Sequence, residues 1–163
     1  MKILIINGSP KGERSNALKL SGAFARGCQS AEGLVRHLMA YDIKPCKGCF
    51  ACWTATPGVC VIRDDVSQIL TDLLQADIII WSFPLYYYSV PGMLKNLIDR
   101  QLPFSQPFMT DRKDGVGNGS HPSRYDRSGK RHVLISTCGF YTSEGNYGAV
   151  EQMFDHICGK DGY

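Results

Sequence analysis

Residues 2–16, KILIINGSPKGERSN, join a short apolar run to a turn of small polar residues. The run from residue 2 to residue 6 has the character of a strand buried at the centre of a parallel sheet. Residues 8–10 (Gly-Ser-Pro) end that strand, and Ser15-Asn16 provides side chains that cap a helix N-terminus. The stretch therefore predicts a strand, a tight loop and a helix in succession, which is the first unit of an α/β fold.

The same loop has the features of an anion site. In such a loop, free backbone N–H groups and the positive end of the helix dipole face the bound group. The spacing fits neither G-x-x-x-x-G-K-[ST] nor G-x-G-x-x-G, so neither a triphosphate loop nor a dinucleotide loop is indicated. Hydroxyl groups suit a single terminal phosphate, although an ordinary capped turn has the same composition. The residues predicted to hold the phosphate are Ser9, Pro10, Lys11, Arg14, Ser15 and Asn16.

Composition indicates a single globular domain over residues 1–163. The chain is 44% hydrophobic and 20% charged, which is typical of globular proteins. Its net charge of +3 is too small to favour binding to nucleic acid or to a membrane. No apolar stretch reaches membrane-spanning length, and the first strand leaves no room for a signal peptide. We therefore expect a cytoplasmic protein.

The rest of the chain alternates between strand and helix patterns. Apolar runs predict further strands at residues 33–42, 77–83 and 132–137. Apolar residues three or four positions apart predict helices that begin near residues 17, 66, 91 and 150. This alternation favours a doubly wound parallel sheet with helices on both faces.

Two segments interrupt the alternation. Residues 103–131 form a long polar loop, a length typical of lids, partner contacts or disordered segments. The chain then ends at Tyr163, where a fifth strand would normally enter. The strand at 132–137 would lie at the sheet edge although it reads as buried. Either a second chain covers that edge or the polypeptide is shortened.

In an open parallel sheet, ligands bind at the carboxyl ends of the strands, where the strand order reverses. The segments that follow the third and fourth strands are 84–92 and 136–141. Three consecutive tyrosines, 86–88, would expose much aromatic surface unless a flat ligand, the long loop or a neighbouring subunit covered them. A phosphate loop with aromatic and backbone-rich walls suits FMN.

Three segments resemble the flavin-contacting segments of the flavodoxin-like NAD(P)H-dependent FMN reductase family: GSPKGERSN (8–16), PLYYYSVPGMLKNLIDR (84–100) and STCGFY (136–141). The resemblance implies a flavodoxin-like fold with strand order 2-1-3-4, bound FMN, and a dimer or tetramer with flavin sites near subunit interfaces. The family's fifth strand and last helix are missing here. By position, the resemblance implies ring contacts from Pro84, Leu85, Tyr86, Tyr87, Thr137, Cys138 and Gly139.

Four of the seven cysteines form a C-x2-C-x2-C-x7-C motif at Cys46, Cys49, Cys52 and Cys60. In a cytosolic chain such clustering favours metal or redox chemistry over structural disulfides. The motif resembles that of the iron–sulfur flavoproteins, which carry a [4Fe–4S] centre beside FMN. The longer string CKGCFACWTATPGVCVIRDD also resembles flavin reductases in which these cysteines are free thiols. A [4Fe–4S] cluster, a zinc ion, a metal-free thiol loop and a disulfide formed in air are the alternatives.

The resemblance implies an FMN-dependent oxidoreductase. Electrons would pass from NADH or NADPH through FMN to a quinone, a free flavin, a nitro or azo compound, or a partner protein. No side chain is expected to act as a catalytic acid or base. The alternatives are an iron–sulfur flavoprotein, a flavodoxin-type electron carrier, and a shortened relative that binds flavin weakly. Carriers of that type are usually acidic, unlike this chain.

Other charged residues have structural interpretations. Asp64-Asp65 is expected to cap the second helix. Lys95, Asp99 and Arg100 are expected to form a solvated helix face.

Overall fold

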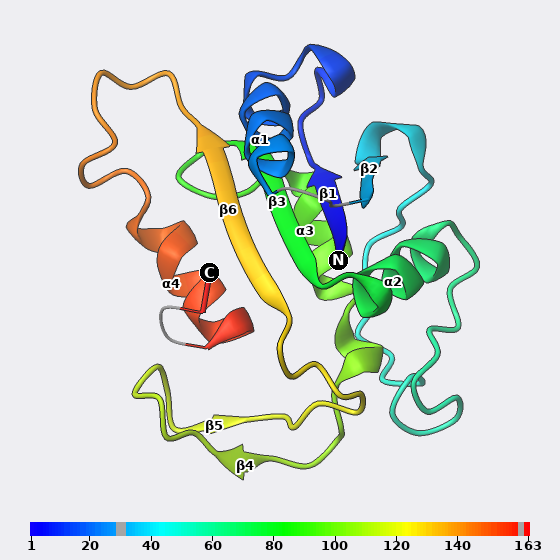
Figure 1. Ribbon diagram of the computed structural model, residues 1–163. Helices are drawn as coiled ribbons and strands as arrows, with labels where there is room; N and C mark the ends of the chain where they lie inside the picture. The colour runs from blue at the N-terminus through cyan, green and yellow to red at the C-terminus, as the bar shows by residue number, and fades with distance from the viewer. Residues whose placement is uncertain (29–31, 160–161) are drawn as a thin grey trace.

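The computed structural model describes residues 1–28, 32–159 and 162–163 (Figure 1). A four-stranded sheet has the order β2-β1-β3-β6, and every neighbouring pair is parallel. The strands are β1 (Lys2–Asn7), β2 (Glu32–His37), β3 (Ile78–Pro84) and β6 (Arg131–Thr137). Because β6 is the fourth strand of this sheet, the predicted order 2-1-3-4 is confirmed.

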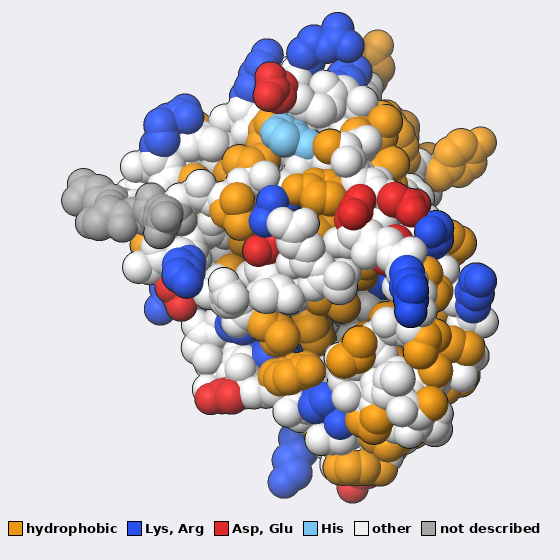
Figure 2. Space-filling view, turned by 90° about the vertical axis from the view of Figure 1, so that its right-hand side faces the viewer, with side chains coloured by type: hydrophobic (Ala, Val, Ile, Leu, Met, Phe, Trp, Pro, Cys, Tyr) orange, Lys and Arg blue, Asp and Glu red, His pale blue; other side chains and the backbone are white. Residues whose placement is uncertain are grey.

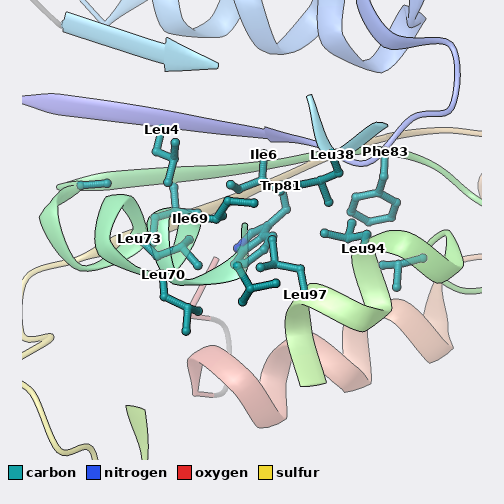
Figure 3. Packing of buried hydrophobic residues seen from close by; sticks show 14 of the residues in the cluster. Leu4, Ile6, Leu38, Ile69, Leu70, Leu73, Trp81, Phe83, Leu94 and Leu97 are labelled. Atoms are coloured by element: carbon teal, nitrogen blue, oxygen red, sulfur yellow. The ribbon is translucent and has the colours of Figure 1, made fainter. Parts of the chain in front are cut away.

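Helices cover both faces of the sheet, as predicted. One face carries α1 (Asn16–Gly27), and the other carries α2 (Val66–Gln75), α3 (Gly92–Asp99) and α4 (Gly148–Cys158) (Figures 1 and 3). None of the described helices is long and apolar enough to cross a membrane.

The core follows from the alternation of side chains along the central strands. Ile3 and Ile5 pack with residues of α1 on one face. Leu4 and Ile6, on the opposite face, join the larger cluster with α2, α3 and α4 (Figure 3). Burial on both faces explains why β1 and β3 read as continuous apolar runs in the sequence.

The second strand is shorter than predicted. Pairing with β1 ends at His37, and residues Leu38–Ala40 form a 3-10 turn instead of continuing to residue 42. Leu38 is completely buried in the larger cluster, and the Tyr41 amide donates to its carbonyl at 3.2 Å. The turn therefore places an apolar side chain in the core.

The polar segment 103–131 contains local structure. A short antiparallel hairpin pairs β4 (Thr110–Asp111) with β5 (Gly119–Ser120), and a bridge joins Ser105 to Ser123. The hairpin lies near the end of the molecule where β6 begins (Figure 1), opposite the carboxyl ends of the sheet strands.

Candidate functional site

The loop after β1 is organised around Asn7, a completely buried residue. Its amide Nδ2 donates to the Gly12 carbonyl at 2.9 Å and lies 3.0 Å from His37 Nδ1. Its Oδ1 accepts from the Ser9 amide at 3.2 Å. Asn7 thus fixes both limbs of the loop and ties them to the end of β2. Sequence reasoning missed this residue, because it lies between the apolar run 2–6 and the turn at 8–10 and carries no signal of its own.

Gly8 allows the loop to pass close to α3. Its amide donates to the Ser82 carbonyl on β3 at 2.9 Å. A Cβ atom at this position would lie 3.0 Å from Leu94 Cβ, which is tighter than an ordinary packing contact. The loop therefore sits directly between β3 and the first turns of α3.

Two buried hydroxyl groups line the loop. Ser9 and Ser15 are 3% and 2% exposed. Ser9 Oγ accepts from the Lys11 amide at 3.3 Å. Ser15 Oγ accepts from the Leu18 amide at 3.3 Å and so caps α1, as predicted. Because a hydroxyl both accepts and donates, each retains a proton to offer to an anion.

The remaining predicted phosphate residues surround these hydroxyls. Pro10, Lys11, Arg14 and Asn16 are all exposed, so two positive charges border the loop. The first amides of a helix have no partner within that helix. Among the described residues, no hydrogen bond is found for the amides of Asn16 and Ala17. The start of α1 can therefore donate to an anion with the dipole behind it.

The segment after β3 forms a tight turn of tyrosines. The amides and carbonyls of Tyr86 and Ser89 exchange hydrogen bonds of 2.9 Å. Between them, Tyr87 and Tyr88 have φ angles of 49° and 61°. Each left-handed non-glycine residue costs about 1–2 kcal/mol. Tyr87 is 99% exposed, so no packing of its ring explains that strain, and strain of this kind concentrates at binding sites.

The segments after β3 and β6 meet at the same edge of the sheet (Figure 1). The Leu85 amide donates to the Thr137 carbonyl at 2.8 Å, and the rings of Tyr88 and Phe140 stack with centroids 5.6 Å apart. Cys138 is half-buried next to these contacts. The structure thus brings together the two predicted ring-contacting segments.

Further polar groups lie near this edge. Ser82 Oγ and Ser136 Oγ, close to the ends of β3 and β6, are buried and have no hydrogen-bond partner among the described residues. Burial and the neighbouring Cys138 thiol raise the pKa of the Tyr147 phenol. Tyr147 carries no local sequence signal. The end of β1 offers hydroxyl and amide donors of the kind that bind phosphate, and the segments after β3 and β6 offer aromatic side chains. Together these groups fit a flat ring that carries a single phosphate.

The four predicted metal ligands lie in the loop between Ala40 and Val66, at the opposite end of α3 from Gly8. Cys46 and Cys49 are exposed, Cys60 is half-buried and Cys52 is buried. All four line one cavity of about 10 Å³, which has room for about one water molecule.

Hydrophobic side chains are exposed among charged ones on the side of the molecule that carries β2 and α2 (Figure 2).

The thiols are gathered but not arranged as around a bound metal. Within the described residues, no group of three or more metal-binding side chains has a coordinating arrangement. Burial, and secondarily the neighbouring Cys60, raise the pKa of the Cys52 thiol. The donor set of four cysteines on one short loop still matches the chemistry of a cluster or a zinc ion.

The predicted solvated face of α3 is correct for Lys95 and Asp99 and wrong for Arg100. Lys95 and Asp99 form an exposed ion pair of 2.7 Å. The Arg100 side chain is 1% exposed and pairs at 2.6 Å with Asp64, whose side chain is fully buried. Arg100 follows the last residue of α3, where the chain turns away from the helix and its side chain can point inward.

The predicted capping of α2 is divided between two aspartates. Asp64 Oδ1 accepts from the Val66 amide at 3.2 Å. Asp65 occupies the N-cap position without a capping hydrogen bond from its side chain, and instead accepts from the Asp42 amide at 2.8 Å. Burial alone would raise the pKa of the Asp64 carboxyl, but its hydrogen bonds with Arg100 and two backbone amides lower it overall.

Comparison with known proteins gives consistent matches. Proteins with a flavodoxin-like fold match the chain over residues 1–160. An iron–sulfur flavoprotein of Archaeoglobus fulgidus is 41% identical over 102 residues, which cover 61% of this chain and 48% of that protein. An FMN-dependent NADH:quinone oxidoreductase of Stenotrophomonas maltophilia is 29% identical over 140 residues, which cover 85% of this chain and 67% of that protein.

Among solved structures, an FMN-dependent NADH-azoreductase of Bacillus anthracis in complex with FMN matches with a TM-score of 0.64. The match has 20% identity and covers 100% of this chain and 84% of that one, so it shows a common fold. The chain spans about half the length of the iron–sulfur flavoproteins that it matches, between 47% and 59%.

Proposed function

Because the chain belongs to the family of proteins with a flavodoxin-like fold, we propose that it is an FMN-dependent oxidoreductase. Its electron donor is NADH or NADPH, and its acceptor is a small molecule such as a quinone. One observation carries the proposal: a loop of phosphate-type donors and two aromatic segments converge at the carboxyl edge of β1, β3 and β6. The names of the quinone reductase and iron–sulfur flavoprotein relatives support it.

The loop after β1 holds the phosphate of FMN. The hydroxyls of Ser9 and Ser15, together with the first amides of α1, donate to the phosphate oxygens. Lys11 and Arg14 attract the anion from solvent, and their exposure makes that attraction sensitive to salt.

The two later segments hold the ring. Pro84 and Leu85 supply backbone and apolar contacts, and the exposed rings of Tyr86 and Tyr87 cover a flat surface. Thr137, Cys138 and Gly139 border the ring from the end of β6. Bound FMN supplies the transfer of electrons between donor and acceptor. The protein orients the ring, screens it from water and leaves one face open for stacking, without a catalytic acid or base.

A spectroscopic experiment tests this function. The protein is purified without oxygen, supplied with FMN, desalted, and titrated with NADPH or NADH before a quinone is added. We expect about one FMN per chain, loss of the flavin absorption on reduction, and recovery with the quinone. FMN that stays oxidised with both nicotinamides would favour an electron carrier. A protein that takes up no FMN would contradict the proposal.

We also propose that the protein is a cytoplasmic homodimer or homotetramer. β6 lies at one end of the sheet order, and an unpaired strand edge favours association. Light scattering after gel filtration measures the mass directly, and a stable monomer with full FMN content would contradict this assembly.

A second function is favoured by the cysteine loop. Its four thiols line one cavity, and the iron–sulfur flavoprotein relatives carry the name of such a centre. We propose that Cys46, Cys49, Cys52 and Cys60 hold a [4Fe–4S] cluster, which adds one-electron transfer to the same protein. Iron and acid-labile sulfide are measured after anaerobic purification. Cys49→Ser should abolish the brown colour and leave the flavin spectrum, whereas colour that survives the change excludes this loop.

A further inference from the structure

A buried ion pair lies directly beneath the cysteine loop. Arg100 Nη1 and Nη2 donate to the two carboxylate oxygens of Asp64 at 2.6 and 2.9 Å. The two side chains are 1% and 0% exposed. A buried pair with this fork geometry is directional, and removing one partner leaves an uncompensated charge in the interior.

The same two side chains hold both ends of the loop. On the entry side, Arg100 Nη1 donates to the Lys44 carbonyl at 2.8 Å, and the Lys44 amide donates to Asp64 Oδ2 at 3.0 Å. On the exit side, Arg100 Nη2 lies 3.5 Å from the Ile62 carbonyl, and Asp64 itself begins the approach to α2. The ion pair therefore holds the two ends of the segment 44–64 together, next to the end of α3.

The guanidinium also faces the thiols. Arg100 lines the same small cavity as the four cysteines. Arg100 Nε is buried and has no hydrogen-bond partner among the described residues. One N–H of a fixed cation thus has no oxygen partner after Asp64 and the two carbonyls are satisfied. It lies in a cavity that the four cysteines line together with apolar residues such as Phe50, Val61 and Leu102.

We propose that Arg100 is a positioning residue of the cysteine loop, which it closes through Asp64 while offering its positive charge and free N–H to a cluster bound by the thiolates. This inference rests on the proposed [4Fe–4S] site and deepens it. A cluster with four thiolate ligands carries net negative charge. Donors near its sulfurs stabilise the more negative, reduced form and raise the reduction potential.

The test compares three variants after anaerobic reconstitution with ferrous iron and sulfide. Asp64→Asn combined with Arg100→Gln removes both charges together, so no unpaired charge is buried. Arg100→Lys keeps the charge without the fork. Lys95→Gln, on the exposed face of the same helix, is the matched control. FMN content reports folding, because the phosphate loop lies at the other end of α3.

We expect the double variant to bind FMN normally, to retain at least threefold less iron after desalting, and to show a more negative cluster potential in a redox titration followed by electron paramagnetic resonance. The cluster potential of Arg100→Lys should lie between that of the double variant and that of the wild type. Iron content and potential equal to those of Lys95→Gln would overturn the role of Arg100.

Hydrogen exchange separates this outcome from failure of the cluster itself. In the iron-free protein, amides of residues 44–64 should exchange at least tenfold faster in the double variant than in the wild type. Equal exchange would overturn the closure of the loop by the ion pair. If the wild-type protein binds no iron, the proposed cluster and its link to Arg100 are both wrong. Hydrogen exchange of the iron-free protein would still test whether the ion pair closes the loop.

Discussion

Replacing Ser15 with alanine should weaken two separate properties, because its hydroxyl has two partners in the proposed complex. In the protein without FMN, Ser15 Oγ caps α1 through the Leu18 amide. Loss of such a cap costs about 1 kcal/mol of folding free energy. In the complex, the hydroxyl also donates to a phosphate oxygen, and a hydrogen bond to a charged group contributes about 1.5–3 kcal/mol.

These magnitudes predict roughly a ten- to hundredfold increase in the FMN dissociation constant for Ser15→Ala. The cap loss does not produce that increase. A domain with typical stability of about 5–15 kcal/mol stays almost fully folded after losing 1 kcal/mol. The two effects are therefore measured independently, by urea unfolding of FMN-free protein and by quenching of FMN fluorescence on binding.

Two further variants serve as references. Ser21→Ala removes a buried hydroxyl of the same helix, which donates to the Ala17 carbonyl at 2.9 Å. It should alter stability and leave FMN affinity unchanged. Asn16→Ala removes an exposed side chain at the start of α1 and should weaken FMN binding with little change in stability. If Ser15→Ala and Asn16→Ala both bind FMN within twofold of the wild type, the phosphate loop is wrongly assigned.

Three other predictions concern stability. Gly8→Ala should destabilise the protein by about 1–3 kcal/mol in urea unfolding, because its Cβ would press on Leu94; Gly33→Ala, which meets nothing within 4 Å, is the control, and equal costs would refute the close approach. Tyr87→Gly should stabilise the FMN-free protein by about 1 kcal/mol by relieving its positive φ, and a loss of stability would show that the turn is not strained. Burial lowers the pKa of His132 to about 4 from 6.5, so the unfolded chain binds more protons than the folded protein between these pH values. The free energy of unfolding should therefore fall by about 3 kcal/mol as the pH drops from 6.5 to 4. His132→Gln should flatten that part of the pH profile, and an unchanged profile would exclude His132 as its source.

The sheet could be predicted because its central strands are buried on both faces. β1 and β3 read as apolar runs whatever surrounds them, and the alternation with helices favours a parallel sheet. Their order follows from the family resemblance. The end of β2 could not be predicted in the same way. Residues 38–42 have the composition of a strand, and the turn at Leu38 depends on a core that other segments build.

The candidate site likewise contains residues that local sequence could predict and residues that it could not. Ser15 and the tyrosine segment have local signals, namely a helix cap and consecutive aromatic residues. Asn7 and Arg100 act through partners far away in the sequence: His37 lies 30 positions from Asn7, and Asp64 lies 36 positions from Arg100. Arg100 also continues a charged pattern with Lys95 and Asp99, so its local context favours solvent exposure.

The three segments of the candidate site, 8–16, 84–88 and 137–141, lie near the beginning, the middle and the end of the chain. Parallel pairing of β1 with β3 and of β3 with β6 joins residues of large sequence separation, and contacts of this kind form slowly in folding. The ligand surface is complete when β6 has docked. FMN should therefore bind after the sheet has formed and should not assist its formation. We expect FMN to slow unfolding, while the refolding rate stays the same with and without it.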